Sequence, residues 1–248
     1  ITKMLFFFFC HTIFSLRTID PQGYGSVNQN QPYLRSIGRK TYSRIPESAE
    51  GRIPDVVFKR WHTSTAIKFV FLTNSTTINV NYNKQKLLGP FNMMPDTGTY
   101  GLTLYAYDED GFEHIVFPAE YVINSQVCFF NYRELPNKTY EYHLFLPNYD
   151  QVTSITLDID DYATIKFAKS FNERPVLIYG TSITHGASPV HPAISWANIV
   201  HRKIDHPVLN FGIMGFAMME PEVISYVLYS TEPIAVVFDC LPNICIES

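Results

Sequence analysis

Three short, largely apolar runs in the C-terminal third of the sequence constrain the fold most strongly. They are residues 176–179, 208–211 and 234–238. Runs of this kind, without polar alternation, are typical of strands that are covered on both faces of a parallel sheet. Between them, residues 193–204 and 221–229 have the length and spacing of helices. The β-α-β-α-β order predicts a three-layer α/β domain with right-handed crossovers, which we place at residues 171–248.

The preceding part of the chain follows a different pattern. Apolar and polar residues alternate in short segments, most clearly at Ile78, Val80 and Tyr82, and turn-forming groups such as Asp108-Glu109-Asp110-Gly111 separate them. This pattern predicts an antiparallel β-sandwich, which we place at residues 20–170. The predicted fold class is therefore α/β, with an N-terminal antiparallel β-sandwich followed by a partial three-layer domain with a parallel sheet. Strands are expected at residues 66–72, 78–82, 102–104, 115–117, 140–146 and 155–159.

The first residues predict the compartment. Lys3 and Met4 precede a short apolar run over residues 5–10, which is typical of a signal peptide and too short to span a bilayer as a helix. We assign residues 1–19 to a signal peptide, with a buried N-terminal strand as the alternative. No other stretch is long and apolar enough for a membrane anchor, so we expect a secreted protein. Possible glycosylation acceptors at Asn74 and Asn137 agree with this expectation.

Composition excludes several classes of protein. The 248 residues are 46% apolar, so the chain is long and apolar enough to bury a core and is not disordered. A net charge of -4, without runs of Lys or Arg, argues against a nucleic-acid partner. Cys128, Cys240 and Cys245 are too few for a disulfide framework, and Cys240 is either a buried thiol or the partner of Cys245. The histidine and acid spacings match no metal site, so we expect no metal and no cofactor.

Candidate chemistry lies directly after the three predicted parallel strands. Ligands bind at the carboxyl ends of the strands in open α/β sheets. Ser182 follows the first strand in a turn flanked by Gly180 and Gly186, where a serine is commonly only a helix cap. Gly215 after the second strand offers a backbone N–H, and Asn243 after the third offers a side-chain amide. Together with the Ser182 N–H, these donors are expected to converge on one oxyanion.

Several ordered motifs resemble those of the SGNH (GDSL-like) hydrolases. The similar segments are residues 179–188, 207–212, 219–222 and 239–243. Within that family the chain resembles a branch with a β-sandwich ahead of the hydrolase domain, marked by a Gly-x-Asp-Leu-Tyr motif. Residues 101–105 resemble that motif, with Thr103 in place of Asp, and residues 44–46 and 144–147 are also similar. The resemblance spans about residue 40 to the end of the sequence.

This resemblance implies a serine esterase with Ser182 as the nucleophile. Gly215 and Asn243 would complete the oxyanion hole together with the Ser182 N–H. Thr181 and His185 are expected either to contact the substrate or to support the site from behind. The expected substrate is an acylated carbohydrate or another small polar ester, and the chemistry requires neither cofactor nor metal.

The sequence also departs from the family. Met214, Phe216 and Ala217 flank Gly215, where the family tends to carry Ser-Gly-Asn-Gly. The family's general base is a histidine in an Asp-x-x-His block near the C-terminus, and no histidine of this sequence follows an aspartate by three residues. We therefore expect a C-terminally truncated chain, and residues 1–248 alone are expected to be poorly stable and inactive on esters. The alternatives are a catalytically silent protein that binds a glycan or a partner, and, third, a lipase.

Overall fold

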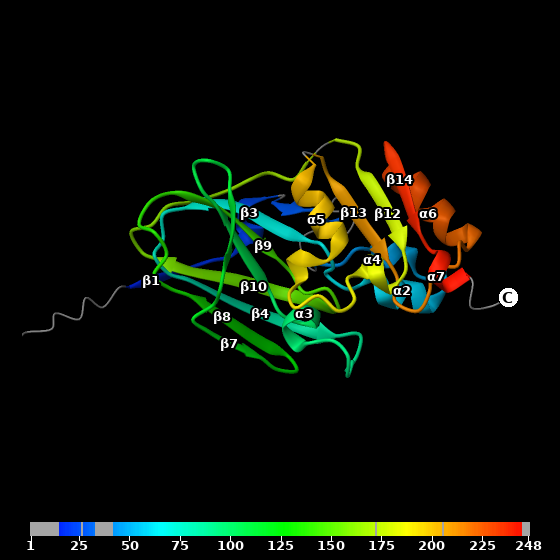
Figure 1. Ribbon diagram of the computed structural model, residues 1–248, viewed down its shortest axis with the longest axis horizontal. Helices are drawn as coiled ribbons and strands as arrows, with labels where there is room; N and C mark the ends of the chain where they lie inside the picture. Colours follow the sequence, from blue (N-terminus) through cyan, green and yellow to red (C-terminus); the bar gives the residue numbers. More distant parts are fainter. Residues whose placement is uncertain (1–14, 26, 33–41, 172, 205, 245–248) are drawn as a thin grey trace, which may run out of the picture.

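An antiparallel β-sandwich and a three-stranded parallel sheet lie side by side in the computed structural model (Figure 1). The predicted fold class is confirmed. The structure describes residues 15–25, 27–32, 42–171, 173–204 and 206–244.

The sandwich consists of two sheets that enclose one apolar core. Alternating side chains of each strand point into it, as Ile78, Val80 and Tyr82 do. The first sheet has the order β1 (Leu16–Ile19), β10 (Asp150–Asp160), β4 (Ile78–Lys86), β8 (Val127–Tyr132) and β7 (Glu120–Ile123). The second has the order β11 (Ile165–Phe167), β3 (Lys68–Thr73), β9 (Tyr140–Phe145), β5 (Thr103–Tyr107) and β6 (Glu113–Val116), and β2 (Asn28–Gln29) pairs with β3.

The parallel sheet has the order β13 (Val208–Gly212), β12 (Val176–Gly180) and β14 (Ala235–Asp239). Gly180 at the end of β12 is in register with Gly212 on one side and with Asp239 on the other. All three carboxyl ends therefore lie at one edge of the sheet. The helices α5 (Trp196–Lys203) and α6 (Pro221–Thr231) connect the strands, as the sequence predicts.

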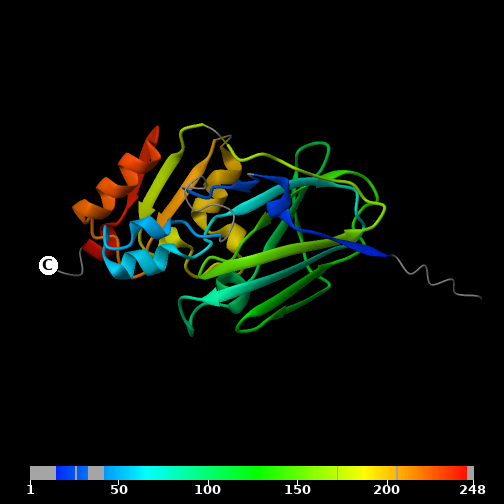
Figure 2. The same cartoon turned by 180° about the vertical axis from the view of Figure 1, so that it is seen from behind.

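Helices cover both faces of this sheet. Ile178 and Val208 pack against Ala197 of α5 on one face. The opposite face packs against α6 and against a further helix, α2 (Asp55–Trp61), whose Val57 and Trp61 are fully buried there. Helix α2 thus belongs to the core of the α/β part, although residues 20–170 are predicted as sandwich. Figure 2 shows α2 beside the parallel sheet from behind.

The predicted signal segment is only partly within the described residues. Residues 1–14 lie outside them, whereas β1, at the end of the segment, pairs with β10. A cleaved signal segment would have to end before Leu16 for β1 to stay in the sheet. No helix in the described ranges has both the length and the apolar character needed to cross a membrane. Cys128 and Cys240 are buried free thiols, and Cys245 lies outside the described residues.

Candidate active site

The segments that follow the three parallel strands are tied together at the carboxyl edge of the sheet. The Thr181 N–H donates to the Asp239 carbonyl at 3.0 Å, and the Ile213 N–H donates to the Gly180 carbonyl at 2.8 Å. The Thr184 hydroxyl also donates to the Asp239 carboxylate at 2.6 Å. These bonds place the segments that carry Ser182, Gly215 and Asn243 at one edge, as the sequence predicts.

Ser182 is the first residue of the short helix α4 (Ser182–His185). Thr181 caps this helix, because its hydroxyl accepts a hydrogen bond from the Ile183 N–H at 3.3 Å. Thr181 is buried, and its hydroxyl is engaged in this cap. Ser182 itself is half-buried, and within the described part of the chain neither its hydroxyl nor its backbone N–H donates a hydrogen bond. Both groups are therefore free to meet a ligand.

Gly215 occupies a tight turn that follows β13. The turn is closed by the Phe216 N–H, which donates to the Ile213 carbonyl at 3.2 Å. Gly215 has a φ of 66°, in the left-handed region that other residues adopt only with strain. No acceptor for the Gly215 N–H is found among the described residues. The backbone therefore offers an unpaired donor at the same sheet edge as Ser182, at a residue that has no side chain of its own.

Asn243 lies on the short helix α7 (Leu241–Ile244) and is half-buried. Its Nδ2 donates a hydrogen bond to the Phe216 carbonyl, directly after Gly215. An amide nitrogen carries two hydrogens, so a second one is available for a ligand. Asn243 follows β14, whereas Gly215 follows β13 on the opposite side of β12. The Asn243 side chain nevertheless reaches the Gly215 turn.

His185 is fully buried, and protein groups surround its ring. Its Nδ1 accepts the Met214 N–H at 3.3 Å, and its Nε2–H donates to the Asn148 carbonyl at 2.9 Å. These partners define a neutral tautomer in which both ring nitrogens are in use. The Tyr149 ring stacks on the imidazole at 4.4 Å. Burial, followed by the positive charge of Arg44, holds the pKa of His185 well below its usual value, so this histidine supports the Met214 backbone.

The other described histidines have partners elsewhere in the molecule, and none has a contact with Ser182. His62 lies 2.9 Å from the Ser43 hydroxyl, and His191 lies 3.3 Å from the Thr103 hydroxyl. A proton acceptor for Ser182 is therefore not found among them. In the part of the chain that the structure describes, no three His, Cys, Asp or Glu side chains gather as metal ligands.

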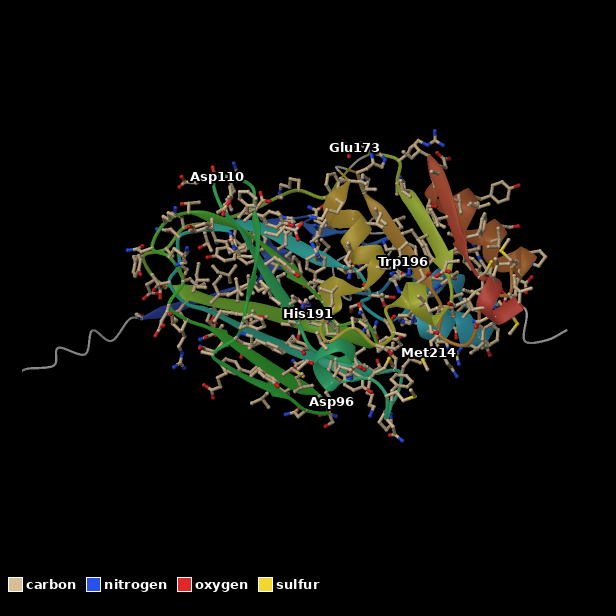
Figure 3. All side chains as sticks on the ribbon, viewed as in Figure 1. Asp96, Asp110, Glu173, His191, Trp196 and Met214 are labelled. Atoms are coloured by element: carbon tan, nitrogen blue, oxygen red, sulfur yellow. The ribbon has the colours of Figure 1, made fainter. Side chains whose placement is uncertain are left out.

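Two arginines of the N-terminal part also reach this edge, and no sequence motif assigns either of them to the site. Arg44 is fully buried, and its Nη1 donates to the carbonyls of Asn210 at 2.9 Å and Gly212 at 3.0 Å. Arg60, on α2, donates to the carbonyl of Met214, which Figure 3 labels at the end of the sheet. The resemblance at residues 44–46 pointed to Arg44 without giving it a role. The only signal for α2 was the helical spacing of Ile53, Val57 and Trp61.

Both parts of the chain match known families. Residues 24–165 match the GxDLY model, described as the N-terminus of the SGNH-hydrolase type of esterase. Residues 173–248 match the GDSL-like lipase/acylhydrolase family. A search of curated proteins gives no match.

Two solved structures share the fold. A GDSL-like lipase from Bacteroides ovatus is 22% identical, with a TM-score of 0.80 and coverage of 92% of this chain. The salicylyl-acyltransferase SsfX3 from a tetracycline biosynthetic pathway is 16% identical, with a TM-score of 0.68 and coverage of 94% of this chain. This chain spans 65% and 64% of the length of those two chains.

Proposed function

Because this chain belongs to the SGNH-hydrolase type of esterase, with a GxDLY N-terminal domain followed by a GDSL-like lipase/acylhydrolase domain, we propose that it is an acyl-ester hydrolase with Ser182 as nucleophile. One observation carries the proposal. The free hydroxyl and N–H of Ser182 share a sheet edge with the free N–H of Gly215 and the amide of Asn243. A nucleophile beside several converging donors is the arrangement that acyl transfer requires.

In the proposed reaction, the Ser182 hydroxyl oxygen attacks the ester carbonyl carbon, and its proton passes to a solvent water and from there to the alkoxide oxygen of the departing alcohol. The carbonyl π electrons move to the carbonyl oxygen, which becomes an oxyanion held by the N–H groups of Ser182 and Gly215 and by Asn243. Collapse of this intermediate expels the alcohol, and water then releases the acid from the acyl-serine. Loss of one donor costs about 3 kcal/mol of transition-state stabilisation.

The proposed substrate is a small acyl ester on a carbohydrate or another polar alcohol, met outside the cell. The exposed loop position of Asn137, as a glycan acceptor requires, supports the extracellular setting, whereas Asn74 is half-buried. The two similar solved proteins, described as a GDSL-like lipase and a salicylyl-acyltransferase, support chemistry on an acyl group.

Turnover of a chromogenic acetyl ester tests the proposal. The protein expressed from its own gene is expected to hydrolyse the ester, and Ser182→Ala is expected to abolish turnover. Ser188→Ala is the matched control, because Ser188 is exposed in the segment that follows α4 and takes no part in the proposed chemistry. Activity that survives Ser182→Ala, or folded protein without activity on any short-chain ester, would overturn the proposal.

A second candidate function is the recognition of a glycan or partner without hydrolysis. The observation that favours it is the absence of a proton acceptor for Ser182 among the described histidines, together with the bulky Met214 and Phe216 beside Gly215. A folded protein that binds an acylated glycan and leaves its ester intact would favour this candidate.

A further inference from the structure

The guanidinium of Arg60 lies against the turn that carries Gly215. Its Nη1 donates to the Met214 carbonyl, and its Cζ lies 5.4 Å from the centre of the Phe216 ring. A Cβ atom added to Gly215 would come within 3.2 Å of the same Nη1. Arg60 thus contacts Met214 and Phe216 and lies beside Gly215 between them.

Arg60 is itself held in place by the buried layer beneath it. Helix α2 is fixed on the sheet by Val57 and Trp61. The Arg60 carbonyl accepts hydrogen bonds from Arg44 Nη2 and from the Thr63 hydroxyl, both at 3.0 Å. No carboxylate pairs with Arg60 within the described ranges, so its charge is directed at the turn and not at an acid.

The residues on either side of Gly215 are also held by other bonds, from the Met214 N–H to His185 Nδ1 and from Asn243 Nδ2 to the Phe216 carbonyl, so Arg60 adds to contacts that fix the two ends of the turn. Gly215 has a left-handed backbone, no side chain and no hydrogen bond of its own to the described residues. A misplacement of about 1 Å at a catalytic group is enough to cost roughly 100-fold in rate. The Arg60 guanidinium contacts Met214 and Phe216, the residues on both sides of Gly215, and so limits such movement.

We infer that Arg60 is a positioning residue for the oxyanion hole. It holds the Met214–Gly215–Phe216 turn in the conformation that presents the Gly215 N–H, so the N-terminal domain supplies part of the active site. The inference rests on the proposed esterase function for its effect on rate. Its structural part, the hold on the turn, is independent of that function.

Kinetics of Arg60 variants test the effect on rate. Arg60→Ala is expected to lower kcat by about 10- to 100-fold and to leave KM within about twofold, because the oxyanion forms only in the transition state. Arg60→Lys retains a cation and is expected to recover part of the loss. Lys59→Ala is the matched control, since it removes a positive charge from the exposed side of α2. Unchanged kcat in Arg60→Ala would overturn the inference.

Glycine-selective ¹⁵N NMR tests the hold on the turn without any activity. The chain has 12 glycines, and Gly215→Ala identifies the Gly215 signal. Arg60→Ala is expected to shift or broaden this signal and to leave those of Gly51 and Gly111 unchanged, which also shows that the variant is folded. If Arg60→Ala does not fold, Arg60→Lys decides in the same way. An unmoved Gly215 signal overturns the inference, whereas a moved signal in a protein without esterase activity overturns only the proposed function.

Discussion

Arg44 makes long-range hydrogen bonds at the site, to the carbonyls of Asn210 and Gly212. Its guanidinium has no carboxylate partner among the described residues and is surrounded by oxygen atoms of uncharged groups. Burial lowers its pKa to about 9, so it stays charged at neutral pH. It joins the end of β13 to the end of α2, and therefore links the Gly215 turn to the helix that carries Arg60.

Replacement of Arg44 by methionine, which has a similar length, is expected to destabilise the fold. Several buried carbonyls would lose their donor, at about 1–3 kcal/mol for each. The expected loss in the free energy of unfolding is about 3 kcal/mol or more, measured by urea denaturation. Arg133→Met is the control, because Arg133 is exposed and its closest acid, Glu120, is 3.6 Å away. A loss below about 1 kcal/mol for Arg44→Met would contradict this reading.

At this scale the sequence predicts positions better than contacts. Ser182, Gly215 and Asn243 follow apolar strands at a shared edge, and the structure has them there, while their chemical roles stay predictions. Arg44 and Arg60 were not assignable, because their acceptors are backbone carbonyls more than 150 residues away. Such contacts leave no local pattern in the sequence.

Helix α5 is the element that joins the two parts of the molecule. One side packs on the parallel sheet, and the other lies over the outer face of β5 and β9. There Arg202 pairs with Glu113 at 2.8 Å and lies 4.5 Å from the Tyr105 ring. The helix is predictable from its spacing, but its second partner is not.

Helix α2 and strands β7 and β8 were missed because α2 is only seven residues long, β7 is largely exposed and β8 lacks regular alternation.

Basic groups crowd this junction. Lys68 Nζ lies 3.0 Å from His143 Nδ1, and His143 Nε2 lies 2.8 Å from the Glu141 carboxylate. His201 on α5 is buried with its Nδ1 3.0 Å from the Asn30 amide. Burial lowers the pKa of Lys68 to about 7 and also lowers the pKa values of His143 and His201. The junction therefore disfavours protonation of these groups.

Because these buried basic groups resist protonation, the fold is expected to lose stability at acidic pH. In the unfolded chain His143 and His201 are protonated near pH 6.5, whereas in the folded chain their lowered pKa values delay protonation to lower pH, so the free energy of unfolding falls as the pH drops below about 6.5. His201→Gln is expected to flatten this dependence between pH 7 and 5 by up to about 1.4 kcal/mol per pH unit. His114→Gln, at an exposed site, is the control. Equal slopes for His201→Gln and the wild type would contradict the expectation.

For the whole molecule, the α/β core is discontinuous in the sequence. It combines β12, β13, β14 and α6 with residues of the segment 45–61. The sequence predicts two successive units because each has its own hydrophobic period. Helix α2 precedes most strands of the sandwich in the sequence but packs on the parallel sheet. The hydrophobic pattern does not predict this packing, because it depends on which segments cover the folded sheet.

Residues 171–248 expressed alone are expected not to fold, because one face of the sheet would lose Val57, Trp61 and the Arg44 bonds. Circular dichroism during urea titration measures this. Residues 15–248, which keep β1 and β2, are expected to give a cooperative transition at low urea concentration, and residues 171–248 none. A cooperative transition for residues 171–248 alone would show that α2 is dispensable.

Covalent labelling of Ser182 tests the central claim most directly. A fluorophosphonate is applied to the folded protein expressed from its own gene, and the adduct is located by mass spectrometry. The expected result is one adduct on Ser182 that is absent in Ser182→Ala and forms about 100-fold more slowly in Asn243→Ala. No adduct on folded protein, or labelling that persists in Ser182→Ala, would contradict the claim that this sheet edge is an esterase active site.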